Sequence, residues 1–222
     1  MLYHYTVVEQ ALDNGKLSND NNLALCYQGV KEGHPLGYYI IPYALGKIID
    51  LKMVFIILPI ILGLISLLLT YVLVKRLWSR KIALITLFFL AISLGHISKS
   101  FSFSYRGENL IYPFILGALI LAEKGLSEKK GNYLILGGML SGITAWFWNG
   151  YPLVIAIYLL ALGFFLGFKY FKGDEGFLQN CKLITQSLLA QSTVVLSIVW
   201  TVELAGKGLV FGREYYPFII LS

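Results

Sequence analysis

The chain has 222 residues, of which 57% are hydrophobic, 15% aromatic and only 14% charged. A soluble domain of this length does not need so apolar a composition, so these values exclude an ordinary soluble globular protein and indicate a polytopic membrane protein. The formal net charge of +6 favours contact with anionic lipid, and because no basic patch is interleaved with aromatic residues, the sequence argues against a nucleic-acid partner.

The amino-terminal segment, residues 1–52, is mostly polar and is predicted to form an external loop domain with two surface helices. Residues 3–17 are predicted to form an amphipathic helix that ends at Asn14 and Gly15. The apolar face of this helix consists of Val7, Val8 and Leu12. Residues 33–49 begin with a His-Pro turn and continue as a Tyr-rich helix, which is predicted to lie in the membrane interface because Tyr rings there keep one end in water.

Six apolar segments follow, each long enough, or nearly so, for the roughly 20 residues with which a helix crosses a bilayer. Helices are expected because hydrocarbon offers backbone groups no partner, and because the segments lack the alternation of barrel strands. The expected fold class is therefore an all-α helical bundle over residues 53–205, with residues 206–222 beginning a further loop or helix. The six segments are residues 53–74, 82–98, 109–125, 133–149, 151–168 and 183–202. The third is limited by Glu123 and Lys124 at its end.

Basic residues predict the orientation of this bundle, because Lys and Arg favour cytoplasmic loops when the loops are short. The loops richest in basic residues carry Lys75, Arg76, Arg80, Lys81, Lys124, Lys129, Lys130, Lys169, Lys172 and Lys182. These loops are predicted to be cytoplasmic, so residues 1–52, the turns at 99–108 and 149–151 and the carboxyl end face outward. The chain is expected to be an integral protein of the cell membrane, with any active-site loops on the non-cytoplasmic side.

This orientation requires the polar amino-terminal segment to cross the membrane. Residues 1–20 lack the basic flank and apolar run of a signal peptide, so they do not explain the transfer. Either a membrane helix precedes Met1 in a longer protein, or the first apolar segment carries its own flank across. The first alternative is the favoured expectation.

Glycines four residues apart occur twice within the predicted bundle, as Gly138 with Gly142 and Gly163 with Gly167. Such pairs of small residues let two helix backbones approach closely in a membrane. Both pairs are therefore predicted to be helix-packing surfaces.

Two further motifs fall in the turns that are expected on the outward face. They are SYRGENL at residues 104–110 and AWFWNGYPL at residues 145–153. Charged and polar groups gathered on one side of a bundle indicate where a membrane enzyme works. The second motif is also typical of a tight turn that closes a helical hairpin, with Trp146 and Trp148 in the aromatic belt.

Taken in chain order, these motifs resemble the catalytic subunit family of oligosaccharyltransferase. The resemblance rests on YHYT, which opens the first external helix at Tyr3, on the Tyr-rich helix, on YRGEN between two membrane helices, and on WFWNGYP. It covers the chain from about Tyr3 to about Ala205 and implies the amino-terminal part of a GT-C-like glycosyltransferase membrane domain. Thr6 stands where the family has Arg, and Asn149 replaces the first Gly of the family's Trp-Gly-Gly-Tyr-like turn.

The resemblance also implies a site. Glu108 matches the second carboxylate of the family's Asp-x-Asp or Asp-x-Glu pair, whereas Arg106 replaces the first. Glu108 is therefore the expected catalytic and metal-ligating residue for Mg²⁺ or Mn²⁺, and a carboxylate suits such hard ions. Arg106, whose guanidinium can grip phosphate, and His4 are expected to bind the lipid phosphate. A plainer alternative is that Glu108 and Asn109 only cap the helix while Arg106 extends to the interface.

The implied reaction transfers a glycan from a dolichyl phosphate or diphosphate carrier to Asn in a protein sequon. The expected partners are the lipid-linked oligosaccharide, an acceptor protein and membrane lipid. Because the family's first acidic motif and its soluble carboxyl-terminal domain have no counterpart in the sequence, the chain is expected to be an incomplete and inactive fragment. Two alternatives remain open: another lipid-phosphate-sugar-dependent GT-C glycosyltransferase, and a nonenzymatic membrane subunit or remnant.

Overall fold

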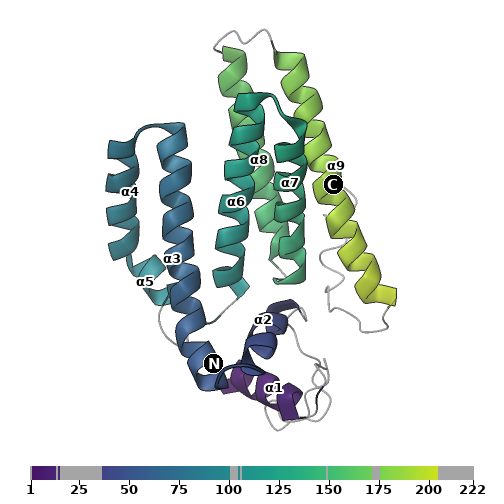
Figure 1. Ribbon diagram of the computed structural model, residues 1–222. Coiled ribbons are helices and arrows are strands. Elements are labelled where there is room, and N and C mark those ends of the chain that lie inside the picture. The colour runs from purple at the N-terminus through teal and green to yellow at the C-terminus, as the bar shows by residue number, and fades with distance from the viewer. Residues whose placement is uncertain are drawn as a thin grey trace. The chain divides into compact units, whose positions relative to one another are not determined.

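A computed structural model shows a helical protein that divides into two compact units. It describes residues 2–13, 15, 37–100, 105, 107–148, 150–171 and 176–204. All secondary structure within these ranges is helical, which confirms the predicted all-α class. The elements are α1 (Leu2–Asp13), α2 (Gly37–Gly46), α3 (Leu51–Leu77), α4 (Arg80–Ile92), α5 (Leu94–Ser100), α6 (Gly107–Glu128), α7 (Gly131–Gly142), the 3₁₀ helix η2 (Ile143–Trp146), α8 (Tyr151–Phe171) and α9 (Phe177–Leu204) (Figure 1).

The boundary between the two units falls within α6, directly after Pro113. The first unit comprises Met1–Pro113 together with Trp146–Trp148, and the second comprises Phe114–Ala145 together with Asn149–Ser222. The first unit therefore holds α1 to α5 and the start of α6, and the second holds most of α6 and the bundle of α7, α8 and α9.

In the first unit, α1 packs against α2. Val7, Val8 and Ala11 on α1 are buried and Leu12 is half-buried, which confirms the predicted apolar face. Gly15 has a φ of 66°, and its N–H donates to the Leu12 carbonyl at 3.3 Å. The glycine thus ends the helix at the predicted place, because a left-handed residue there satisfies a carbonyl of the last turn.

Helix α2 forms where the sequence predicts it, but its first two tyrosines do not keep an end in water. Tyr38 and Tyr39 are 0% and 1% exposed, so the expected interfacial role is wrong for both. Pro42 lies inside the same helix. Because proline has no N–H, the Tyr38 carbonyl, four residues earlier, lacks its usual helical donor. A buried carbonyl that lacks its helical donor needs a hydrogen-bond donor from elsewhere in the chain.

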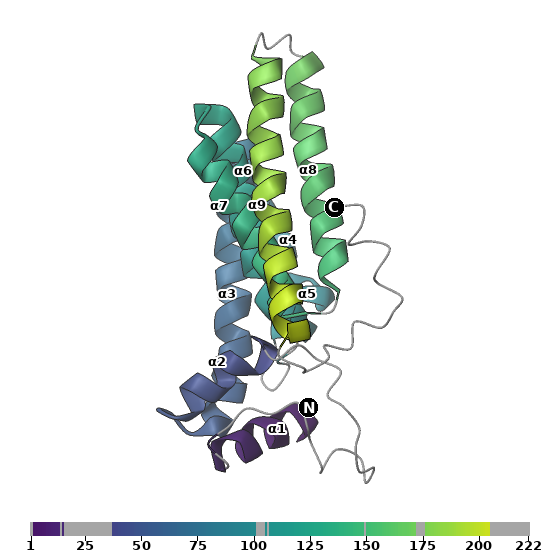
Figure 2. The ribbon, with the colours of Figure 1, turned by 90° about the vertical axis from the view of Figure 1, so that its right-hand side faces the viewer.

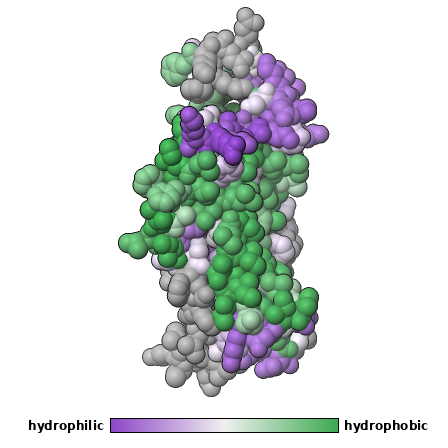
Figure 3. Space-filling view, turned by 60° about the vertical axis from the view of Figure 1, so that its left-hand side comes forward, coloured by the Kyte–Doolittle hydropathy of each residue, from purple (hydrophilic) through white to green (hydrophobic). Residues whose placement is uncertain are grey.

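Helices α3 and α4 form a helical hairpin whose starts are both capped. Asp50 accepts the Lys52 N–H at 2.7 Å, and Ser79 accepts the Ile82 N–H at 3.3 Å. Large apolar side chains on the hairpin are 61–63% exposed, namely Leu64, Leu68, Phe88 and Phe89. Figure 3, in which the hairpin side comes forward, shows a broad hydrophobic surface with hydrophilic residues above and below it. Such a surface is suited to lipid, not to water.

Three of the predicted spans are helices that are long and apolar enough to cross a membrane. They are Leu51–Leu77, Gly107–Glu128 and Phe177–Trp200, which lie in α3, α6 and α9. Helix α6 continues to Glu128, so Glu123 and Lys124 lie inside it and not, as expected, in its last turn. Helix α8 coincides with the fifth predicted span, but its described apolar stretch, Tyr151–Gly167, is shorter. The chain is an integral membrane protein, and its six crossings remain a prediction.

The second predicted span, residues 82–98, is broken at Ser93. Helices α4 and α5 meet there with a bend of 64°, and only if they are counted together do they form a fourth crossing. The Ser93 hydroxyl donates to the Leu90 carbonyl at 2.9 Å and accepts the His96 N–H at 3.3 Å. These bonds replace helical ones at the break, which the apolar pattern on either side does not reveal.

The fourth predicted span, residues 133–149, ends early as an α-helix. Helix α7 stops at Gly142, and the chain continues as η2. The Thr144 hydroxyl donates to the Ser141 carbonyl at 2.6 Å within this tightened turn. The apolar residues that follow, Trp146–Trp148, belong to the first unit. Phe147 is buried there and Trp146 is exposed, and this apolar run does not lengthen the α-helix.

In the second unit, α7 packs closely on α9, as Figures 1 and 2 show. A Cβ atom at Gly138 would overlap the Ser187 carbonyl, and a Cβ atom at Gly142 would lie 2.8 Å from the Gln191 carbonyl. Real Cβ atoms do not come this close to backbone oxygens. The predicted packing surface of the first glycine pair is therefore confirmed.

The second glycine pair, Gly163 with Gly167 on α8, has a different environment. No atom of the described residues lies within 4 Å of a Cβ built at either position, so the predicted close packing is wrong here. Helix α8 instead meets α9 through Tyr158, whose hydroxyl is 2.9 Å from the Ser187 hydroxyl.

Candidate functional site

Two of the predicted site residues, Glu108 and His4, are described in the structure, and Arg106 lies outside the described residues. Glu108 lies in the first turn of α6, where the helix dipole favours a negative charge. Its carboxylate is 3.7 Å from the ammonium of Lys99, in the last turn of α5, and the two side chains are 30% and 31% exposed. A pair this open to solvent contributes about 0–1 kcal/mol to stability, so its charges remain accessible to a ligand.

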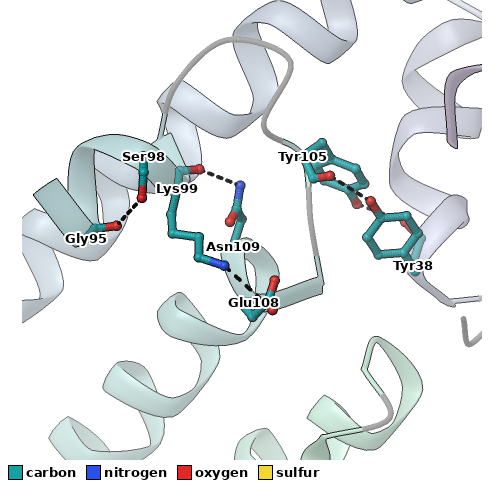
Figure 4. Close-up of polar contacts among 7 residues, drawn as sticks. All are labelled: Tyr38, Gly95, Ser98, Lys99, Tyr105, Glu108 and Asn109. Carbon is teal, nitrogen blue, oxygen red and sulfur yellow. Dashed lines mark hydrogen bonds and ion pairs between the residues drawn. The ribbon is translucent and has the colours of Figure 1, made fainter. Parts of the chain in front are cut away.

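The residue after Glu108 joins the same two helices. The Asn109 amide donates to the backbone carbonyl of Lys99 at 2.7 Å, and Asn109 is 5% exposed. Figure 4 shows the two contacts side by side, one to the Lys99 side chain and one to its backbone. This bond fastens α6 to α5, and the plainer capping alternative stays a prediction.

Three residues before Glu108, Tyr105 fastens the same segment to α2. The Tyr105 hydroxyl donates to the Tyr38 carbonyl at 2.8 Å, and the Tyr38 hydroxyl donates to the Tyr105 carbonyl at 2.8 Å (Figure 4). The first bond satisfies the carbonyl that Pro42 leaves without a helical donor. Tyr105 is 3% exposed, and burial, aided by the neighbouring Tyr38, raises the pKa of its hydroxyl well above the ordinary value of 10.0.

His4 belongs to the same cluster of aromatic residues. Its Nδ1 lies 2.9 Å from the Tyr39 hydroxyl, and its ring centroid is 5.0 Å from that of Tyr38. The structure therefore connects His4 to the Glu108 segment through Tyr38 and Tyr105. A phosphate-binding role for His4 is not tested by these contacts and stays a prediction.

The turn at Trp146–Trp148 also touches this segment. A Cβ atom at Gly107 would lie 2.8 Å from Cδ1 of Trp148, and one at Gly37 would overlap the Trp146 carbonyl. Only glycine allows these close approaches, so both glycines serve packing in the first unit. Trp146 is 40% exposed, whereas Phe147 beside it is buried. Parts of all four external motifs of the sequence, around His4, Tyr38, Tyr105 and Trp148, thus belong to one compact unit.

The described residues do not by themselves fit a divalent metal ion. Mg²⁺ and Mn²⁺ need several hard oxygen ligands. No group of three or more His, Cys, Asp or Glu side chains is placed to hold a metal within the described ranges. Glu108 offers one carboxylate, and the Lys99 ammonium lies 3.7 Å from it. Glu108 as a metal ligand therefore stays a prediction.

Lys99, Tyr38 and Tyr105 hold the Glu108 segment, and sequence reasoning assigned none of them to the site. Lys99 is nine positions from Glu108, and the two charges meet where the last turn of α5 lies beside the first turn of α6. One signal was available in the sequence: a proline four residues after Tyr38 predicts an unsatisfied carbonyl if the segment is helical.

Comparison with known proteins gives a family for this arrangement. Residues 35–213 match the family described as "Oligosaccharyl transferase STT3, N-terminal". The chain is 30% identical over 193 residues to "Dolichyl-phosphooligosaccharide-protein glycotransferase 2" of Pyrococcus furiosus, and 32% identical over 202 residues to the protein of the same name of Pyrococcus horikoshii. Each match covers 82% of this chain and 26% of the relative, so the chain spans about a quarter of the length of these curated relatives.

A solved structure has a similar fold. The crystal structure of the Archaeoglobus fulgidus oligosaccharyltransferase in the apo form matches 99% of this chain and 32% of its own, with a TM-score of 0.61 and 14% sequence identity. The resemblance that the motifs predicted is confirmed. Because the family match extends over most of the sequence and the relatives are named glycotransferases, the chain belongs to the STT3 family of oligosaccharyltransferases.

Proposed function

We propose that this chain provides the amino-terminal membrane part of a glycosyltransferase that moves a glycan from a dolichyl phosphate or diphosphate carrier to Asn of an acceptor protein. Family membership and the names of the archaeal relatives support the reaction class. The observation that carries the proposal is the junction of α5 and α6, where an accessible ammonium and carboxylate lie 3.7 Å apart. Buried hydrogen bonds from Asn109 and Tyr105 hold this junction.

In this proposal, cationic side chains bind the phosphate of the lipid-linked donor, and the Glu108 carboxylate binds the Asn side chain of the acceptor protein. An ammonium or a guanidinium attracts phosphate, so Lys99 joins Arg106 and His4 as a donor-binding residue. When the Lys99 ammonium pairs with a lipid phosphate, it no longer pairs with Glu108. The Glu108 carboxylate can then accept a hydrogen bond from the Asn side-chain amide of the acceptor. Mg²⁺ or Mn²⁺ remains an expectation from the family resemblance. Since the described residues include no group of three or more His, Cys, Asp or Glu placed to hold a metal, no step is assigned to the ion.

The proposal includes a side of the membrane. The basic loops predict that the junction of α5 and α6 faces away from the cytoplasm, with membrane lipid around α3, α4 and α6. The remaining predicted spans, at residues 82–98, 133–149 and 151–168, would complete six crossings. Both the donor and the acceptor protein would then approach Glu108 from the outer side.

Donor binding tests the role of Lys99. The purified chain in lipid nanodiscs is titrated with dolichyl phosphate, and binding is followed by the fluorescence of its tryptophans. Lys99→Gln is expected to weaken binding by roughly tenfold, because a charge-assisted contact is lost. Glu108→Gln should leave binding equal or tighter, since it removes a negative charge beside the phosphate. Lys47→Gln, at an exposed position on the loop after α2, is the matched control. Equal affinity in Lys99→Gln and the unchanged chain would contradict the assignment.

An activity measurement tests the second part of the proposal. The chain is incubated with lipid-linked oligosaccharide, a sequon peptide and Mg²⁺ or Mn²⁺, and glycopeptide is measured by mass spectrometry. No transfer is expected, because among the described residues only Glu108 is assigned to hold and polarise the amide, and one carboxylate is not sufficient. Transfer by these 222 residues would contradict the expected inactivity.

The nonenzymatic alternative has one observation in its favour, namely Arg106 in place of the family's first carboxylate. It predicts that dolichyl phosphate does not bind and that replacing Glu108 by Ala changes no measured property. The other alternative, a different GT-C glycosyltransferase, predicts that the donor binds but that no glycan is transferred to Asn, also when transfer is measured in native membranes.

A further inference from the structure

A second group of charges lies at the turn between α3 and α4. Lys75 and Arg76 are in the last turn of α3, and Arg80 and Lys81 begin α4. All four side chains are exposed, and Trp78 between them is 65% exposed. We call these five residues the basic turn. It takes no part in the site around Glu108.

The sequence around the basic turn contains no acidic residue. No Asp or Glu occurs between Asp50 and Glu108. Helix stability explains only half of these charges. Lys75 and Arg76 are favourable in the last turn of α3, whereas Arg80 and Lys81 in the first turn of α4 oppose the dipole of that helix. The other end of α3 differs, since Asp50 accompanies the cations of Lys47 and Lys52.

The depth of the turn follows from the length of α3. A helix of 27 residues extends about 40 Å, whereas the hydrocarbon core of a bilayer is about 30 Å thick. Because α3 is longer than the core is thick, its last turn can lie at the level of the lipid headgroups while the rest of the helix spans the core. The lipid-facing side chains of the hairpin lead directly to it, with Leu68 on α3 61% exposed and Ile85 on α4 57% exposed. Figure 3 shows such hydrophobic surface giving way to hydrophilic residues.

We propose that the basic turn binds the headgroups of anionic phospholipids in the leaflet that it faces. Its four cations can each pair with a lipid phosphate, and the guanidinium groups can do so through two hydrogen bonds. Trp78 is suited to the same depth, because an indole ring packs against the upper acyl chains and keeps its N–H near water. Attraction to the headgroups also offsets the unfavourable charge at the start of α4. The surface thus selects anionic over zwitterionic lipid.

Lipid selection by the purified chain tests this proposal. The chain is placed in mixed micelles that contain equal amounts of phosphatidylglycerol and phosphatidylcholine, and the lipids that it retains are measured by native mass spectrometry. Replacing Lys75, Arg76, Arg80 and Lys81 together by Gln is expected to reduce the preference for phosphatidylglycerol by about an order of magnitude or more. Exchanging Lys and Arg among the same positions should keep the preference, since the charge is unchanged.

A matched control carries the same kind of change at the other end of α3. Lys47→Gln with Lys52→Gln removes two cations and should retain the preference of the unchanged chain, whereas Arg80→Gln with Lys81→Gln, which also removes two, should weaken it. This pair of variants distinguishes the basic turn from net charge. Circular dichroism of every variant verifies the helix content. An unchanged preference in the fourfold Gln variant would overturn the proposal. So would loss of bound phosphatidylglycerol on adding inorganic phosphate but not on adding chloride at equal ionic strength, because the site would then select the phosphate ion and not a lipid.

Discussion

A single missing N–H explains much of the arrangement around Glu108. Pro42 leaves the Tyr38 carbonyl without a helical donor, and the hydroxyl of Tyr105 provides the replacement at 2.8 Å. The reciprocal bond from Tyr38 to the Tyr105 backbone then fixes the chain just before α6. Because both side chains are buried, water does not compete for the groups that form these two hydrogen bonds. The position of Glu108 thus depends on a helix that is remote in the sequence.

Replacing Tyr105 by Phe should destabilise the protein by about 1–3 kcal/mol, because the buried Tyr38 carbonyl then loses its donor. Tyr112→Phe, at a 50% exposed position in α6, is the control and should stay within about 0.5 kcal/mol. The free energy of unfolding in detergent micelles measures both. A loss in Tyr105→Phe no larger than in the control would show that the Tyr38 carbonyl finds another partner.

The same residue predicts a dependence on alkaline pH. Burial raises the pKa of Tyr105 well above 10.0 in the folded protein, so the folded state holds this proton more tightly than the unfolded state does. The resulting stability is complete below pH 10.0 and is lost as the pH rises through the folded pKa. Unfolding free energies measured on either side of pH 10.0 should therefore fall more steeply in the unchanged protein than in Tyr105→Phe. Parallel curves would contradict the assignment.

At the scale of whole helices, α7 and α9 show how a membrane bundle replaces hydrophobic driving force with close packing. Ser187 donates to the Leu134 carbonyl at 2.7 Å, and Gln191 donates to the Ser141 hydroxyl at 2.7 Å. Both polar residues are buried and lie one turn apart on α9. The glycines of α7 let its backbone approach closely enough for these bonds to form.

The two glycine pairs give a matched test of this packing. Gly138→Ala should destabilise the protein by about 1–3 kcal/mol, because the added methyl group overlaps the Ser187 carbonyl and separates the helices. Gly163→Ala should be neutral or slightly stabilising, since its surroundings are open and Ala favours the helix. Thermal unfolding in the same detergent compares them. An equal loss of stability in both variants would contradict the open surroundings of Gly163 and indicate that α8 packs closely at this position.

At the scale of the whole molecule, the orientation can be measured directly. Single cysteines are introduced as Ala44→Cys and Ser79→Cys after Cys26 and Cys181 are replaced by Ser. A maleimide that does not cross membranes should label Ala44→Cys in intact cells and Ser79→Cys only after permeabilisation, because α3 lies between the two positions. Labelling of both from the same side would contradict α3 as a span, and the reverse pattern would contradict the predicted orientation.

The sequence by itself determined the properties that arise from local composition. Apolar length was sufficient to identify α3, α6 and α9 as spans, and the small residues of α7 indicated a packing surface. The motifs around His4, Glu108 and Trp148 were sufficient to identify the family, since each is a short run of neighbouring residues. These features are readable because their physical cause lies within a few positions of the residues concerned.

Only the tertiary structure decided features whose cause is distant in the sequence. The pairing of Lys99 with Glu108 depends on how the end of α5 meets the start of α6, and the burial of the Tyr38 carbonyl depends on the hydrogen bond that the Tyr105 hydroxyl donates to it. Hydrophobicity cannot distinguish a residue that faces lipid from one that packs against another segment, which is why Trp146–Trp148 were read as the end of a membrane helix. Burial and hydrogen-bond partners depend on which surfaces meet, and composition does not determine that.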